Sequence, residues 1–331
     1  MVDNAKRFEL ALRPDTVLDE VYESRAKWKE TVLLFTRNKG ALISLVFLVI
    51  IIAVALIGPL VSGFTYDELD LTRQNLPPRI PGLEKLGIFN GTLGGEDLYE
   101  LKGYKGSYFW FGTDKLGRDL FTRFCCGTRI SLFIGAISAV LNMIIGVTFG
   151  LVSGYYGGKV DILMQRFLEV LNGIPNLVIV SLLVIVLQPG IPSIVVAMAI
   201  SQWTVTARLT RANTLRLKEM EHVMASRTMG VRTFNILFRE IFPNLLSTVI
   251  VMCMLSVPGA IFMEAFLSFV GLGIPNPQAS LGSLINDGFN NMLMYPYQMA
   301  IPAITFSLLM LALNMIGDGL RDALDPTMKQ V

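Results

Sequence analysis

The hydrophobic residues of this 331-residue chain gather in long runs with one charged side chain or none. A helix needs about 20 consecutive apolar residues to cross a bilayer core of about 30 Å. Residues 41–62 form one such run, and further runs lie at about residues 130–154, 245–267 and 299–320. The pattern predicts that each of these four runs is a membrane-spanning helix.

The longest charge-free run, residues 170–207, is too long for a single crossing. It is interrupted at residues 188–192 by the sequence Gln-Pro-Gly-Ile-Pro, and Pro-Gly pairs mark turns. We therefore predict two helices joined by a tight turn. Together with the four other runs, this gives an all-α polytopic membrane protein with six transmembrane helices.

Residues 208–243 form a polar segment between two apolar runs. Gly230 is expected to end a first helix there, because glycine adopts the left-handed closing turn of helices at little cost. An i, i+3, i+4, i+7 apolar stripe from Phe234 to Ile241 predicts a second short helix, which Pro243 is expected to stop. The charged residues of the segment are mostly basic: Arg208, Arg211, Arg216, Lys218, Arg227, Arg232 and Arg239, against Glu219, Glu221 and Glu240.

The basic residues predict the orientation of the chain in the membrane. With six spans, both termini lie on one side, and 19 of the 28 Lys and Arg residues belong to that side. The other nine Lys and Arg residues lie from Arg73 to Arg129, along one long loop, and the positive-inside rule is a weaker guide for loops of this length. We therefore predict a cytoplasmic segment 1–40, an extracytoplasmic loop 63–128, a transmembrane core 129–320 with the cytoplasmic loop 208–243, and a cytoplasmic tail 321–331.

Composition agrees with a membrane protein that is not itself an enzyme. Hydrophobic residues make up 53% of the chain and charged residues 16%, whereas soluble domains carry about a quarter charged residues. The net charge of +2 gives no reason to expect nucleic acid as a partner. Three cysteines and one histidine, His222, provide neither a disulfide framework nor a metal site, and no cofactor is expected. A lone histidine leaves the usual catalytic triads incomplete, so no catalytic residue is assigned.

One segment, residues 153–160, is similar to an ATP-binding phosphate loop but does not match it. Ser153 and Val160 stand where the phosphate-loop motif requires Gly and Ser or Thr. We therefore expect any ATP hydrolysis to take place on separate subunits.

The polar segment resembles the signature loop of ABC importer permeases. That signature is commonly written Glu-Ala-Ala, three residues, Gly, about nine residues, Ile-x-Leu-Pro. Ala225, Ser226, Gly230 and Pro243 fall at its matching positions. In the family, the first helix of the loop inserts into a groove on an ATP-hydrolysing subunit. We call residues 208–243 the coupling loop, with the coupling itself expected through residues 214–243.

The match also contains departures. Met224 stands where the family usually has Glu, Ser226 replaces the second Ala, and Phe242 replaces the Leu. Glu221 lies one helical turn before Met224 on nearly the same face. We expect it to take over the part of the missing acid.

Four further segments resemble the dipeptide and oligopeptide branch of these permeases, namely residues 111–132, 264–275, 281–288 and 317–326. They follow the order of that branch, and the likeness extends from about Asn38 to Pro326. The resemblance implies the type I ABC importer permease fold and the transport of oligopeptides or dipeptides. It also implies a cell (inner or plasma) membrane location, a second homologous permease subunit, cytoplasmic ABC ATPase subunits and an extracytoplasmic peptide-binding protein. Nickel is the alternative substrate within the family. A secondary transporter and a membrane scaffold or sensor are the alternatives from other classes.

Polar residues within the spans suggest further roles. Glu264, near the outer end of the fifth predicted span, has no evident partner in the sequence, so we expect it to line the pathway or brace its outer gate. Arg166 and Glu169 are three residues apart and are expected to pair.

Gly146, Gly150 and Gly154 share one helix face that allows close packing, within this chain or against a partner subunit.

Overall fold

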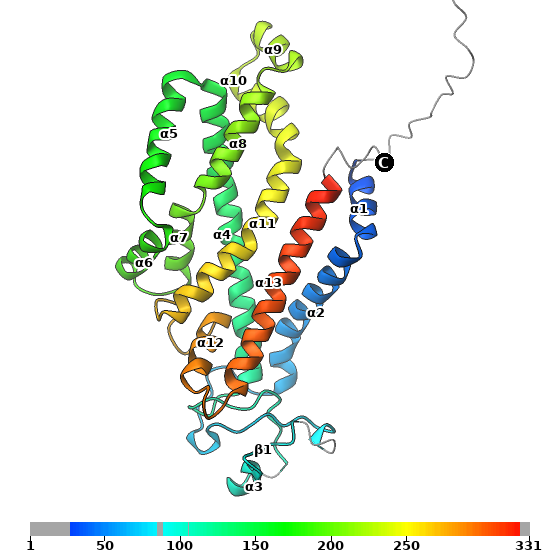
Figure 1. Ribbon diagram of the computed structural model, residues 1–331, viewed down its shortest axis with the longest axis vertical. Coiled ribbons are helices and arrows are strands. Elements are labelled where there is room, and N and C mark those ends of the chain that lie inside the picture. The colour runs from blue at the N-terminus through cyan, green and yellow to red at the C-terminus, as the bar shows by residue number, and fades with distance from the viewer. Residues whose placement is uncertain (1–26, 85–88, 105, 325–331) are drawn as a thin grey trace, which may run out of the picture.

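The computed structural model describes residues 27–84, 89–104 and 106–324. Figure 1 shows a bundle of long helices with a small cap at one end and α9 at the other. The elements are, in order, α1 Lys27–Arg37, α2 Lys39–Ser62, the 3-10 helix η2 Leu71–Arg73, β1 Thr92–Leu93, β2 Glu96–Asp97, α3 Leu98–Leu101, α4 Leu120–Tyr156, α5 Gly158–Gly173, α6 Asn176–Leu187, α7 Ile191–Ser201, α8 Thr204–Leu217, α9 Glu221–Thr228, α10 Thr233–Asn235, the π-helical turn η4 Ile236–Ile241, α11 Phe242–Phe269, α12 Leu281–Asn290 and α13 Tyr297–Leu324.

Four helices in the described chain are long and apolar enough to cross a membrane: α2, α4, the continuous helix Thr233–Phe269, and α13. The pair α5 and α6 makes a fifth if it counts as one broken span, since the two helices meet at 80°. Pro175 explains the break, because it has no N–H to donate and restricts the residue before it. The predicted mainly helical membrane fold is thus confirmed, but its count of six spans is not.

The run 170–207 shows why the count differs. The predicted turn at residues 188–192 is present, because α6 ends at Leu187 and α7 begins at Ile191. The chain is already helical from Gly158, before this charge-free run begins, and α5 and α6 are separated at Pro175. After α7, the path breaks again at Gln202 and Trp203 before α8, a helix with basic side chains.

α4 begins ten residues before the apolar run from which it was predicted. The Asp119 side chain caps it, accepting hydrogen bonds from the backbone N–H (2.8 Å) and hydroxyl (2.6 Å) of Thr122. Arg123 in the first turn is neutralised by Asp114, with 2.6 Å between its Nη1 and a carboxylate oxygen. The loop after α2 therefore ends at Asp119 rather than at residue 128, because capping and ion pairing let charged residues enter the helix.

Pro243 does not stop a helix, contrary to the sequence prediction. It lies in the first turn of α11, directly after η4, and the helical path continues from Thr233 to Phe269. In η4 the N–H of Phe242 bonds to the carbonyl of Leu237, five residues back. This wider turn accommodates a residue without an N–H, so the proline does not interrupt the helix.

The three-glycine face of α4 packs against α8 of the same chain. A Cβ atom added at Gly146 would lie 2.7 Å from Cβ of Thr206, and one at Gly150 2.6 Å from the carbonyl oxygen of Ala207. At Gly154 the nearest atom would be Cβ of Thr214, at 2.7 Å. Of the two alternatives left open by the sequence, packing within this chain is the one that the structure shows.

The loop between α2 and α4 folds into a compact cap. Leu76, Tyr99 and Phe109 form its buried core, and β1 and β2 pair as an antiparallel hairpin. Tyr99 donates a hydrogen bond to the carbonyl of Pro77 at 2.8 Å, and burial raises the pKa of its phenol well above the ordinary value. The cap is thus a small folded unit with its own core, at the opposite end of the molecule from α9 (Figure 1).

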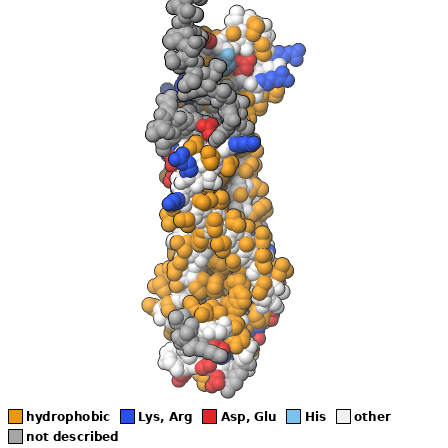
Figure 2. All heavy atoms as spheres, turned by 90° about the vertical axis from the view of Figure 1, so that its right-hand side faces the viewer, with side chains coloured by type: hydrophobic (Ala, Val, Ile, Leu, Met, Phe, Trp, Pro, Cys, Tyr) orange, Lys and Arg blue, Asp and Glu red, His pale blue; other side chains and the backbone are white. Residues whose placement is uncertain are grey.

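Charge divides the surface of the molecule along its long axis. Figure 2 shows a broad band of hydrophobic side chains between two ends with charged ones, and on this face Lys and Arg gather toward the end with α9. A band of this kind suits the hydrocarbon core of a bilayer. The described ends of α1 and α13 lie toward the same end as α9 (Figure 1).

Candidate functional site

The first helix of the coupling loop, α9, ends at Thr228, and Gly230 forms its closing turn as predicted. Gly230 has φ +75°, in the left-handed region, and its N–H bonds to the carbonyl of Arg227 at 3.1 Å. The N–H of Val231 reaches back to the carbonyl of Ser226, also at 3.1 Å. These two bonds form a Schellman motif, which requires a residue that tolerates positive φ. The motif sets the direction in which the chain leaves α9.

α9 projects from the bundle with nearly all of its side chains uncovered. Val223 is its one buried residue, and it packs in a core cluster with α4, η4 and α11. Glu221, Met224 and Ala225 are exposed, and Ser226 is half-buried. The structure therefore brings these four predicted contact residues together on one helix, at the tip of the molecule (Figure 1).

Pro243, the last residue of the predicted set, lies apart from the others. It is exposed in the first turn of α11, with α10 and η4 between it and the α9 turn. Its place suggests a part in the junction between the loop and the long helix rather than in a contact with a partner.

The predicted apolar stripe of the second helix is divided between two faces. Leu237 and Ile241 are buried, whereas Phe234 and Phe238 are 67% and 47% exposed. The rings of Phe234 and Phe238 lie 4.5 Å apart, and the next ring along, that of Phe242, is 6.2 Å from Phe238. The π-helical turn changes the angle between successive residues, so a stripe predicted at 3.6 residues per turn separates here.

Two polar contacts that the sequence prediction missed hold the coupling loop to the bundle. Arg211 on α8 donates two hydrogen bonds to Asp161 on α5, at 2.6 and 2.5 Å. Lys218, just after α8, donates to the carbonyl of Gly154 at the end of α4, at 2.8 Å. Bidentate Arg–carboxylate pairs have a well-defined geometry, so α8 has a fixed position relative to α5. The sequence contained the charges but no signal for their pairing, because they lie 50 residues apart.

Glu264 is not unpaired, contrary to the expectation from the sequence. Its side chain is 0% exposed, and its carboxylate accepts hydrogen bonds from the hydroxyls of Ser131 (2.8 Å) and Ser268 (2.7 Å). Ser131 also accepts the N–H of Leu281, and Ser280, the N-cap of α12, donates to Ser268. We call these residues the Glu264 cluster. It joins α4, α11 and the N-terminus of α12, where the helix dipole favours an acid.

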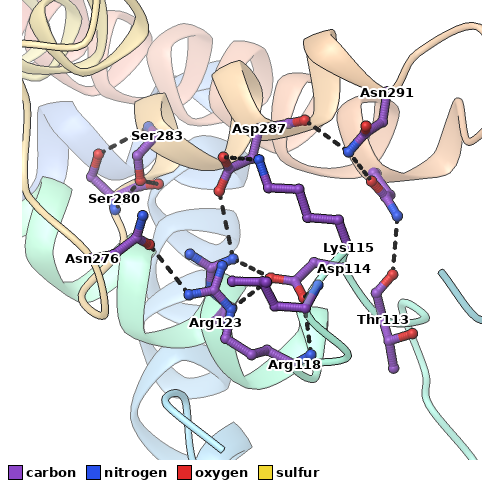
Figure 3. Close-up of polar contacts among 12 residues, drawn as sticks. Thr113, Asp114, Lys115, Arg118, Arg123, Asn276, Ser280, Ser283, Asp287 and Asn291 are labelled. Carbon is purple, nitrogen blue, oxygen red and sulfur yellow. Dashed lines mark hydrogen bonds and ion pairs between the residues drawn. The ribbon is translucent and has the colours of Figure 1, made fainter. Parts of the chain in front are cut away.

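The opposite end of α12 meets a second polar cluster, drawn in Figure 3. The buried Asp114 pairs with Arg118 (2.7 Å) and with Arg123 (2.6 Å). Asp287 on α12 lies 3.6 Å from Arg123 and 3.9 Å from Lys115. α12 is therefore held to the cap and α4 by charge at one end and by the Glu264 cluster at the other.

Other predicted polar residues are placed as follows. Arg166 and Glu169 pair at 2.6 Å on the exposed surface of α5, as expected. Among the described residues, no group of three or more His, Cys, Asp or Glu side chains is arranged to hold a metal ion.

Two family models match this chain. One, described as the binding-protein-dependent transport system inner membrane component, covers residues 146–330, which include α5 to α13. The other, described as the N-terminal TM domain of oligopeptide transport permease C, covers residues 27–78. Together they include the coupling loop and the first helix.

Three curated relatives are similar over most of their length. The oligopeptide transport system permease protein OppC of Bacillus subtilis (strain 168) is 39% identical over 93% of this chain and 92% of its own. The dipeptide transport system permease protein DppC of the same organism is 41% identical over 89% of this chain and 84% of its own. OppC of Escherichia coli (strain K12) is 38% identical, with 92% of both chains covered.

Proposed function

We propose that this chain, which belongs to the family of binding-protein-dependent transport system inner membrane components, forms half of the translocation pathway of an ATP-driven peptide importer. The relatives named above are oligopeptide and dipeptide permeases, which supports peptides as the substrate class. ATP hydrolysis belongs to cytoplasmic partner subunits, a second homologous permease completes the pathway, and an extracytoplasmic binding protein delivers the peptide.

The observation that carries this proposal is the geometry of α9. It is a helix anchored by one buried residue, Val223, closed by a glycine turn, and exposed on its remaining faces at one tip of the molecule. Ala225 in α9 and Gly230 just after it match the family signature, and Ser226 stands at the position of the second Ala. An uncovered helix at this place suits insertion into a groove of an ATPase subunit.

The direction of transport requires α9 to lie in the cytoplasm, where ATP is available. The excess of Lys and Arg in the termini and the coupling loop supports this orientation. The cap would then face the compartment from which peptide arrives, and the binding protein would dock on that side. The chain would lie in the cell membrane with both termini cytoplasmic.

The connections of the coupling loop provide a route from the ATPase to the spans. On one side, α8 is locked to α4 by the glycine contacts and to α5 by the Asp161–Arg211 pair. On the other side, the loop continues without a break into the helix that ends at Phe269. A displacement of α9 by closing ATPases would therefore shift α4, α5 and α8 together and act directly on α11. The opposite half of α11 carries Glu264.

Glu264 is proposed to brace the outer gate. Its carboxylate is enclosed by α4, α11 and α12 of its own chain, so in this conformation it is not open to a pathway. Because it joins the helix that leaves the coupling loop to the outer helix α12, it would make both move as one unit.

Reconstitution of the intact complex tests the proposed function. The complex, purified through a tag on this chain with its ATPases, second permease and binding protein, is placed in liposomes. We expect uptake of a labelled dipeptide or oligopeptide that requires ATP on the α9 side. ATP-dependent uptake of Ni²⁺ without peptide uptake would favour the nickel alternative. Peptide uptake driven by a proton gradient without ATP would show a secondary transporter.

A further inference from the structure

The uncovered surface of α9 and its flanks has an unusual number of exposed methionines. Met224 is 51% exposed, Met220 just before the helix 41%, and Met229 just after it 74%. Burial of apolar area stabilises by about 25 cal/mol per Å², so a partner that covers these side chains gains from doing so. Methionine is also flexible enough to adapt to the shape of an apolar pocket.

Met224 lies on the half of α9 that faces away from the bundle. The buried Val223 and the half-buried Ser226 mark the inner face. At 3.6 residues per turn, Met224 falls beside Glu221 and Thr228 on the outer half. Where the family usually has an acid, this chain therefore presents a thioether to the partner.

Exposed basic side chains outnumber exposed acidic ones in the coupling loop, which contains this apolar site. None of the exposed arginines in the coupling loop forms an ion pair with another described residue, and only two exposed acids lie among them. Charges left without partners on a protein surface favour a partner of the opposite sign. The arginines are Arg208, Arg216, Arg227, Arg232 and Arg239, and the acids are Glu219 and Glu221.

A protein suits this surface better than the bilayer does. Figure 1 shows α9 beyond the ends of α4, α11 and α13, at the tip of the molecule. At physiological ionic strength, charges act over about 8 Å, so arginines beside α9 interact mainly with whatever covers the tip itself.

We propose that the ATPase surface that receives α9 has an apolar pocket for Met224, bordered by acidic side chains. The inference rests on the proposed function and adds the chemistry of the partner. A groove built for the family's usual glutamate would instead present a basic group at this place. An acid introduced into α9 would weaken its binding to an apolar pocket with an acidic border. The same acid would strengthen its binding to a groove with a basic group.

The direction in which Met224→Glu changes ATPase binding therefore tests the pocket. We measure the ATPase retained by the detergent-solubilised complex, purified through a tag on this chain, at increasing dilution. Met224→Glu is expected to weaken retention on the order of tenfold, whereas Met224→Leu keeps the apolar contact and stays within about twofold of the parent. Met292→Glu, which adds the same charge to a 40% exposed methionine after α12, is the matched control. Tighter retention with Met224→Glu would overturn the apolar pocket while supporting docking by α9. Equal retention for all variants would also contradict the proposed docking itself.

Arg227→Glu tests the acidic border. Retention is expected to fall on the order of tenfold at low salt and to lose most of its salt dependence, because exposed charge pairs are screened by ions. Arg227→Lys keeps the charge and should preserve the salt dependence. If Arg227→Glu leaves ATPase retention unchanged but reduces binding of this chain to vesicles containing anionic lipid, the arginines face the bilayer and the acidic border is wrong.

Discussion

At the scale of single residues, Glu264 shows how a buried acid can be structural. An acid within a membrane helix is costly without partners, which is why it stood out in the sequence. The structure supplies those partners from two helices, Ser131 on α4 and Ser268 on its own helix, and Ser131 in turn accepts the N–H of Leu281 at the start of α12. Ser268 lies four residues after Glu264, at the spacing of helix neighbours, and the expectation of an unpaired acid overlooked it. No spacing rule connects Glu264 to Ser131, which lies 133 residues away.

Removing the Glu264 carboxylate should loosen α12. In Glu264→Ala, the hydroxyls of Ser131 and Ser268 lose their acceptor, and each buried group left without a partner costs about 1–3 kcal/mol. We expect a lower apparent melting temperature of the purified complex together with slower peptide uptake. Glu264→Gln retains an acceptor and should fall between Ala and the parent. Ser268→Ala, which removes one of the two bonds, is the matched control.

The result that would exclude a bracing role is specific. If Glu264→Ala melts at the parent temperature and only peptide selectivity changes, the carboxylate acts on the substrate rather than on α12. If neither property changes, the Glu264 cluster has no part in the gate.

At the scale of elements, the lengths of the apolar runs located the long membrane helices but not the exact residues at which they begin and end. α2 and α13 lie within a few residues of their predicted limits because long apolar runs leave few alternatives. α4 starts early because Asp119 caps it, and burial raises the pKa of that carboxyl above its ordinary value. Such contacts form between residues that the fold brings together, so hydropathy alone does not predict them.

The two wrong predictions about helix breaks both concern proline. Pro243 was expected to end a helix and does not, because η4 accommodates it, whereas Pro175 in an apolar run breaks one. The sequence shows the proline but not whether the preceding turn is wide enough to accommodate it. For the coupling loop, motif spacing located α9 and Gly230. The contacts that tie it to the bundle, Asp161–Arg211 and Lys218, became visible only in the fold.

At the scale of the whole molecule, the separation of charge predicts the orientation of the chain in the membrane. α9 and the described ends of α1 and α13 share one end, and the cap lies at the other (Figure 1). A membrane-impermeant thiol reagent on intact cells should therefore label Glu96→Cys in the cap hairpin. Arg232→Cys should stay unlabelled until the membrane is permeabilised. Both side chains are exposed, which makes them a matched pair.

The native cysteines are unsuitable reporters of orientation. Cys125 is fully buried, and Cys126 and Cys253 are partly buried. All three are replaced by alanine before the single cysteines are introduced, and this parent must still take up peptide. Labelling of position 232 in intact cells would reverse the orientation and place α9 away from ATP.

The central claim is that the coupling loop transmits ATP hydrolysis to the spans, and Gly230 tests it most directly. Gly230 has φ +75°, and a Cβ added there meets nothing within 4 Å, so the Cβ of a larger residue acts through backbone strain and not through a clash. Left-handed φ costs about 1–2 kcal/mol for ordinary residues and is especially unfavourable for β-branched ones, whereas asparagine tolerates it. Gly230→Val should misdirect the chain after α9, and Gly230→Asn is the matched control.

The measurement is peptide uptake and peptide-stimulated ATP hydrolysis by the reconstituted complex, side by side for the parent and the two variants. We expect both activities to fall together in Gly230→Val while the binding protein still binds peptide, and both to be largely kept in Gly230→Asn. If Gly230→Val purifies with its ATPases and transports peptide at the parent rate, the loop is not the coupling element.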